Sequence, residues 1–286
     1  MIRRSRTRPL AVALALALAL GGCSSAPTSG HSSAPEPVIT SLEPAIGPLT
    51  PGTTVTITGE HLADVTAVTF AGRAAVDVTV LDDSRVTAVV PVAAEYRPAV
   101  DAVHVFAGSE ALTTDGQLLF ERTATSPVDA QLAYAFAHWS TDTYNREVYG
   151  DFNPVGGDCM NFVSQTLIAR GIPQTDGWNF TSPSEQTASW IYVPAFEDYL
   201  VAHPETGFTR LTIDQRDQVE VGDLVVFDWE GNNSPDHIQV VSDIRDVDGT
   251  RQILMVGHNL DSNWRDLDTV ITVDHPGGLA WFWKVP

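Results

Sequence analysis

The sequence predicts an exported protein of two domains, in which an all-β sandwich precedes an α+β domain. Residues 37–122 consist of short alternating apolar segments that are separated by turn residues and show no helical period. After the composition changes at residues 123–127, apolar residues first recur at helical spacing and then fall into strand-like runs. Roughly 250 residues remain behind the export segment, which suits two modest domains.

The first 22 residues have the features of a bacterial export signal. Four arginines precede the apolar stretch Leu10–Leu20, which is too short to span a bilayer stably. The tetrapeptide that ends at Cys23 resembles a lipobox, which implies cleavage before Cys23 and lipid attachment to its thiol. We therefore expect a lipoprotein signal peptide at 1–22, a flexible tether at 23–36, and a location on the extracellular face of the cell membrane. An ordinary signal peptide with an incidental cysteine is the alternative.

Charge and ligand spacing exclude several classes of partner. The chain has 36 acidic and 16 basic residues, a formal net charge of −20, and a single lysine, Lys284. Such a surface repels phosphate backbones, so no nucleic-acid partner is expected. The sequence has no cluster of residues with zinc-ligand spacing. We expect neither a metal nor a cofactor.

The strands expected in the first domain share an alternating pattern and end at turn residues. Thr53–Thr58, for example, alternates and ends at Gly59. The other expected strands are Val65–Phe70, Val76–Leu81, Arg85–Val90, Asp101–Phe106 and Gln117–Phe120. Many short strands at this spacing favour a β-sandwich.

The opening of this domain resembles the IPT/TIG domain, which has an immunoglobulin-like fold. The resemblance rests on Ile39–Pro44, on the stretch from Pro51-Gly52 to Gly59, and on Phe70-Ala71-Gly72. It covers residues 37–122 and implies a spacer, a binding module or a dimerisation unit, so it assigns no activity. We favour a spacer that holds the second domain away from the membrane.

The second domain, residues 128–286, begins with helices. Helical spacing of apolar residues predicts a helix over Val128–Tyr144, capped by Ser126 or Asp129, and a later helix over Ser189–Leu200. The expected strands follow at Asp223–Trp229, His237–Ile244, Arg251–His258 and Ala280–Val285. Helices followed by an antiparallel sheet make an α+β domain.

Cys159 is the candidate nucleophile. Because Cys23 is expected to carry lipid, Cys159 has no disulfide partner, and a lone thiol in an exported protein is open to oxidation. Two glycines and Asp158 precede it, and the apolar run that follows ends at Gly171. This pattern predicts a tight turn and a helix that begins at Cys159 and stops at Gly171. The helix dipole and the free N–H groups there should lower the pKa of the thiol and activate it.

His237 is the candidate general base. It follows Ser234-Pro235-Asp236 and opens one strand directly after another, at a sheet edge. Histidine suits the role because its pKa lies near neutrality. Other histidines of this domain lie on the first helix or before a proline and are expected to be structural or solvated: His138, His203 and His275.

A hairpin register selects the third residue of the site. If Ile244 pairs with Arg251, His237 lies directly opposite His258, and directly paired residues project to one face with Cβ atoms about 5 Å apart. Asn259 would then point to the other face. A one-residue bulge would change this assignment.

The arrangement resembles papain-like and NlpC-type peptidases and, more closely, the bacterial putative amidase domain family. The second resemblance rests on Tyr144-Asn145, Phe152, the run 156–165, Gly222-Asp223, His237 and the run 258–261. It implies that Cys159 is the nucleophile, His237 the general base and acid, and His258 the residue that orients the base. Asn259 and Asp261 remain alternatives for the third role.

Asp158, Tyr144 and Asn161 are the candidate substrate-binding residues. Asp158 could hold a substrate amine, although we favour a role as helix N-cap, and Asn161 could instead satisfy nearby backbone. The sequence departs from the family at Met160, where Thr is usual, and at Thr166, where Cys is frequent. Four tryptophans either line a cleft or, as we favour, form core: Trp178, Trp190, Trp229 and Trp264.

These expectations define an extracellular, lipid-anchored cysteine amidase or peptidase. We expect Cys159 to form a thioester with the carbonyl of an amide, and His237 to protonate the leaving amine. Cell-wall peptide is the expected substrate, by location and by analogy with NlpC-type enzymes. The alternative is a catalytically silent binding or adhesion lipoprotein, which would have no reason to keep an unpaired exported thiol.

Overall fold

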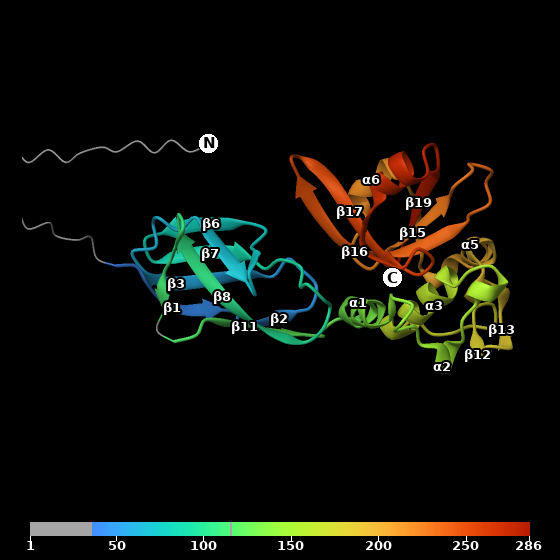
Figure 1. Ribbon diagram of the computed structural model, residues 1–286, viewed down its shortest axis with the longest axis horizontal. Coiled ribbons are helices and arrows are strands. Elements are labelled where there is room, and N and C mark those ends of the chain that lie inside the picture. Colours follow the sequence, from blue (N-terminus) through green and yellow to red (C-terminus); the bar gives the residue numbers. More distant parts are fainter. Residues whose placement is uncertain (1–35, 115) are drawn as a thin grey trace, which may run out of the picture. The chain divides into compact units, whose positions relative to one another are not determined.

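The computed structural model describes residues 36–114 and 116–286 (Figure 1). The expected signal peptide, the lipidation site Cys23 and all but the last residue of the tether lie outside the described residues. Among the helices of the described part, none combines the length and the apolar character needed to cross a bilayer.

The N-terminal region consists of two β-sheets that share one core. The strand orders are β10-β1-β3-β7-β6 and β2-β11-β8-β4-β5, with β9 paired to β8. The strands are β1 (Val38–Glu43), β2 (Ile46–Pro48), β3 (Thr54–Glu60), β4 (Ala67–Phe70), β5 (Arg73–Ala74), β6 (Val78–Asp82), β7 (Arg85–Val89), β8 (Ala99–Ala107), β9 (Glu110–Ala111), β10 (Thr113–Thr114) and β11 (Leu119–Thr123). Alternate residues of β3 and β8, among them Val55, Ile57, Val103 and Val105, are buried in one apolar cluster. This confirms a sandwich-like arrangement.

The structure adds strand β1 in the opening stretch, where no strand was expected. A register shift between Ile39 and Ser41 interrupts its pairing with β3. As a result the buried residues Ile39 and Leu42 are three apart rather than two. The bulge therefore removes the alternation by which a strand is recognised in sequence.

The C-terminal region begins with helices α1 (Pro127–His138), α2 (Arg146–Tyr149), α3 (Cys159–Arg170), α4 (Ala188–Ile191) and α5 (Val193–Ala202). Ser126 caps α1 as expected, because its hydroxyl accepts from the Asp129 amide while the Asp129 carboxylate accepts from the Ser126 amide, each at 3.0 Å. The helix ends at His138, earlier than expected. The single helix expected over 189–200 is α4 and α5, separated at the extended residue Tyr192.

A six-stranded antiparallel sheet follows, with the order β14-β19-β15-β16-β17-β18. Its strands are β14 (Thr209–Thr212), β15 (Leu224–Asp228), β16 (His237–Val247), β17 (Thr250–Gly257), β18 (Ser262–Asp266) and β19 (Leu279–Lys284). Helices followed by this sheet confirm the α+β class. Leu224 and Ile238 pack with α3 in one core, whereas Val225 and Phe227 pack with α6 (Leu267–Thr269) in a second. The two sides of the sheet therefore have different surroundings.

The register of β16 on β17 differs from the expected one. Ile244 pairs with Ile253 rather than with Arg251, because the turn contains only Asp248-Gly249. Both turn residues have positive φ angles, 51° and 77°, as a two-residue hairpin of this kind requires. A further shift between Val241 and Asp243 places a bulge in β16.

Candidate active site

Cys159 is the first residue of α3 and is 8% exposed. The chain reaches it through Gly156 and Gly157, whose φ angles of 136° and 135° are rarely adopted by other residues. At the far end, Gly171 takes the left-handed conformation, and its N–H bonds to the last turn of the helix. The helix expected from the glycines at both ends is confirmed.

Two cavities lie beside Cys159. One, of about 330 Å³, is bordered by Cys159, His237, Trp229 and His275. The other, of about 440 Å³, extends along the start of α5. Asp236 borders both, and no lysine or arginine lines either. A further cavity of about 460 Å³, between the end of α3 and α5, is lined by Trp178 but by none of the candidate catalytic or substrate-binding residues.

The environment of the thiol opposes its ionisation. Burial raises the pKa of Cys159 to about 11, and the negative charge of Asp158 acts in the same direction. The backbone N–H groups of Ile238, Met160 and Cys159 itself donate toward the sulfur and lower the pKa in part. The expected low pKa is therefore wrong, because desolvation outweighs the helix N-terminus. The resting thiol is neutral.

His237 is the first residue of β16, and its ring is buried beside Phe227 and Trp229. Burial lowers the pKa of His237 to about 3, and the charges of Arg265 and His275 add to the effect. The Nε2 atom is buried and has no hydrogen-bond partner among the residues that the structure describes. The imidazole is therefore neutral near pH 7 and can accept a proton.

His237 and Cys159 approach the same cavity from different sides of the sheet. His237 pairs with Phe227, which belongs to the core away from α3. The next residue, Ile238, packs toward α3, and its N–H donates toward the sulfur of Cys159. Because β16 begins at this point, the two side chains border one cavity at the end of the sheet although they do not share a face.

His258 lies beyond the end of β17, on the side of α3. Its ring is stacked between Tyr144 and Phe162, with ring centroids 3.5 and 4.1 Å away. Nδ1 lies 2.7 Å from Oδ2 of Asp158, and Nε2 lies 2.7 Å from the carbonyl oxygen of His138. The observed register thus does not bring His258 opposite His237, and both of its ring nitrogens are bonded elsewhere.

Asp158 is the N-cap residue of α3, as favoured, but its side chain makes no capping hydrogen bond to the helix backbone. Its Oδ1 accepts from the Phe152 amide at 2.8 Å and from Nδ2 of Asn161 at 3.0 Å. Asn161 in turn accepts from the indole of Trp190 at 2.9 Å. Asp158 and Asn161 are buried and line neither cavity beside Cys159.

Tyr144 is also placed behind the nucleophile. Its ring covers His258, and its hydroxyl donates to Asp261. Asp261 also accepts from the amide of Thr141 at 2.5 Å. Asn259 does border the first cavity, but its Oδ1 accepts from the Asp158 amide at 2.6 Å. Asn259 and Asp261, the alternatives for the third catalytic residue, therefore fix the loops around Cys159 through these hydrogen bonds.

Sequence reasoning passed over Asp236 as a residue of the site and expected His275 to be structural or solvated, but both border the first cavity. Trp229, one of the four tryptophans considered for a cleft, also borders this cavity, contrary to the favoured core role. The rings of Trp229 and His275 are stacked 3.9 Å apart. Trp178 and Trp190 belong to the core, as favoured. The position of Asp236 directly before His237 was the available signal.

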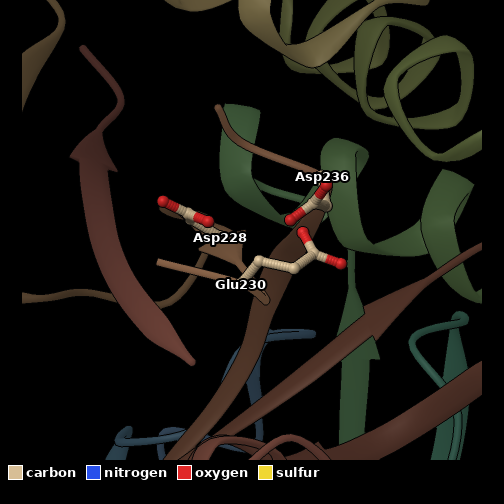
Figure 2. A group of neighbouring side chains, drawn as sticks. All are labelled: Asp228, Glu230 and Asp236. Atoms are coloured by element: carbon tan, nitrogen blue, oxygen red, sulfur yellow. The ribbon is translucent and has the colours of Figure 1, made fainter. Parts of the chain in front are cut away.

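Asp228, Glu230 and Asp236 form an acidic group close to the first cavity (Figure 2). One carboxylate oxygen from each lies within 4.8 Å of the others. Asp228 accepts from the amides of Asn232 and Asn233, and Asp236 accepts from the amide of Trp229. Two of the three carboxylates therefore organise the loop between β15 and β16, and this role accounts for their position.

Comparison with known proteins identifies both regions. Residues 127–277 match the family described as "Putative amidase domain", and residues 37–122 match the IPT/TIG domain. No curated protein matches the chain.

Similar solved structures include two of the Plexin A4 full extracellular region, both 24% identical. They cover 30% and 31% of this chain and 8% and 7% of the Plexin chains, with TM-scores of 0.26 and 0.27. An auxiliary nutrient binding protein from Bacteroides ovatus is 21% identical over 31% of this chain and 21% of its own, with a TM-score of 0.23. The chain thus spans at most about a fifth of the length of these proteins.

Proposed function

The chain belongs to the putative amidase domain family, which supports a hydrolase acting on C–N bonds, and from this premise we propose a cysteine amidase with Cys159 as nucleophile. The observation that carries the proposal is the placement of Cys159. It starts a helix, borders two cavities, and shares one of them with the neutral imidazole of His237.

The proposed reaction starts from a neutral thiol and a neutral imidazole. As Sγ attacks the amide carbon, its proton passes to His237, and a tetrahedral oxyanion forms. The imidazolium gives that proton to the amide nitrogen, the C–N bond breaks, and the amine leaves a thioester on Cys159. Water then attacks the thioester while His237 takes its proton, and the departing sulfur recovers that proton as the acid is released.

Backbone N–H groups stabilise the charges that develop. Cys159 is the first residue of α3, so its N–H has no partner within the helix and can donate to the oxyanion. The N–H of Ile238 lies beyond the β16–β17 ladder, which ends at Val240, and it donates toward the sulfur. It therefore stabilises negative charge on sulfur as the proton leaves.

The proposed substrate is a cell-wall peptide, and the proposed location is the outer face of the membrane through lipid on Cys23. The support is the lipobox-like sequence at residues 20–23 and the export segment before it. Both cavities border Cys159, and together they offer room for an extended peptide next to the nucleophile. The IPT/TIG region would then act as a spacer.

The test uses the purified chain with cell-wall muropeptides and simple peptide amides as substrates. Wild type should release free amine, and Cys159→Ala and His237→Ala should each lower the rate by several orders of magnitude with little change in Tm. The double variant should lose little more, because the two residues act as one unit. His203→Ala is the matched control. His203 lines the separate cavity of about 460 Å³, which Cys159 does not border, so this variant should keep full activity.

Intact-protein mass spectrometry after rapid quenching should show an acyl adduct on wild type that is absent from Cys159→Ala. If wild type cleaves neither substrate class and Cys159→Ala keeps every measurable binding property, the silent binding or adhesion lipoprotein replaces the amidase.

A further inference from the structure

The buried pair of His258 and Asp158 carries an inference beyond the proposed reaction, although it rests on Cys159 being the nucleophile. A backbone carbonyl can only accept, so Nε2 of His258 must donate its proton to the His138 carbonyl oxygen. On the other side, Nδ1 lies 2.7 Å from a carboxylate oxygen of Asp158. Without a proton, the nitrogen and the carboxylate oxygen would both be acceptors and would repel each other at that distance. A proton therefore lies between Nδ1 of His258 and Oδ2 of Asp158.

The location of that second proton follows from the chemistry of the two groups. Imidazole is a stronger base than carboxylate, so the ring carries both protons and Asp158 is ionised. Each side chain is 1% exposed, and a buried charge is tolerated only when it is paired and hydrogen-bonded. The faces of Tyr144 and Phe162, stacked on either side of the ring, also favour a cation between them.

Asp158 connects this pair to the nucleophile. It is the residue before Cys159, and its charge opposes ionisation of the thiol. Its carboxylate also holds the Phe152 amide, and its own amide is held by Asn259. The same residue therefore fixes the turn before α3 and places a negative charge beside the sulfur.

We propose that His258 and Asp158 form an imidazolium–carboxylate pair that positions Cys159 and neutralises the Asp158 charge beside the thiol. His258 is thus a positioning residue, and it does not touch the base His237. The other groups that face it are the hydroxyl of Tyr144, the carboxylate of Asp261 held by that hydroxyl, and the His138 carbonyl of α1. Of these only Asp261 is ionised near neutral pH, so Asp261 is the appropriate control.

The test follows alkylation of Cys159 by iodoacetamide across pH, read by peptide-resolved mass spectrometry on the full chain. His258→Gln keeps a donor near Asp158 but removes the positive charge, so the midpoint of alkylation should rise by about one pH unit. Asp158→Asn combined with His258→Gln leaves no charge at either position and should return the midpoint to the wild-type value. Asp261→Asn combined with His258→Gln should leave it raised.

If His258 had only a structural role, the two interior substitutions would add their destabilising effects. Return of the alkylation midpoint on adding Asp158→Asn therefore distinguishes the proposed role from a structural one. An unchanged midpoint in His258→Gln, or no return in the double variant, would overturn the proposal. If these variants do not fold, ¹⁵N NMR of wild type decides instead: both ring nitrogens of His258 should carry a proton. A neutral ring would refute the pair. No substrate is needed, so failure of amide cleavage contradicts the proposed function alone.

Discussion

At the scale of single residues, burial shifts the pKa values of the two proposed reacting groups in opposite directions. It raises the pKa of the Cys159 thiol to about 11 and lowers the pKa of the His237 imidazole to about 3. Both shifts favour the uncharged form. The resting pair is therefore neutral over most of the accessible pH range, and in the proposed reaction the proton moves during attack on the substrate rather than before it.

His237 should make the folded state sensitive to acid. The unfolded chain takes up a proton near the ordinary histidine value of 6.5, whereas the folded chain does so only near pH 3. The stability contributed by the neutral ring is thus present above 6.5 and is lost as pH falls toward 3. Between pH 7 and 4.5 the loss should be roughly 2–3 kcal/mol. Denaturant unfolding of His237→Gln should lack this component, and His203→Gln should retain it. An equal loss in His237→Gln would contradict the assignment.

At the scale of elements, the β16–β17 hairpin decides which residues meet at the site. Its turn is Asp248-Gly249, and the register that follows differs from one built on a six-residue turn. An Asp-Gly pair between apolar runs is a strong hairpin signal, so this error could have been avoided. The bulge between Val241 and Asp243 could not have been predicted from the sequence, because no residue type marks it.

Gly257, the last residue of β17, should be sensitive to substitution. A Cβ atom there would lie 2.8 Å from Cγ of Gln239, a fully buried residue two positions along β16 from His237. Gly257→Ala should therefore cost about 1–3 kcal/mol of unfolding free energy through overpacking. In a Gln239→Ala background, where the obstructing atoms are gone, the same change should cost much less. Chemical denaturation of the four proteins gives the coupling, and a cost independent of Gln239 would show that the crowding is elsewhere.

At the scale of the whole chain, two regions have distinct family assignments. The IPT/TIG domain covers residues 37–122, and the putative amidase domain covers residues 127–277. The amidase region contains the proposed chemistry. The spacer role of the first region and the lipid anchor stay predictions, and the anchor falls on residues outside the described part.

Anchoring can be tested by Cys23→Ser. Loss of the acceptor thiol should move the protein from the membrane fraction to the soluble fraction, because a lipid chain supplies most of the membrane affinity of such a protein. The measurement is fractionation with and without detergent, together with the mass of the N-terminal peptide. Cys159→Ser removes the other cysteine and should remain in the membrane. A soluble wild type with a free thiol at residue 23 would exclude the lipoprotein.

The sequence by itself determined the two fold classes, the bounds of α3 and the candidate nucleophile. These depend on local chemistry: alternation in strands, the glycines before Cys159 and at Gly171, and the rarity of cysteine. Only the tertiary structure decided the signs of the pKa shifts and the partner of His258. Both depend on exclusion of water and on contacts between distant residues, such as Asp158 and His258, which lie 100 positions apart. No local pattern encodes how many neighbours surround a side chain, so the electrostatics of the site follow from packing alone.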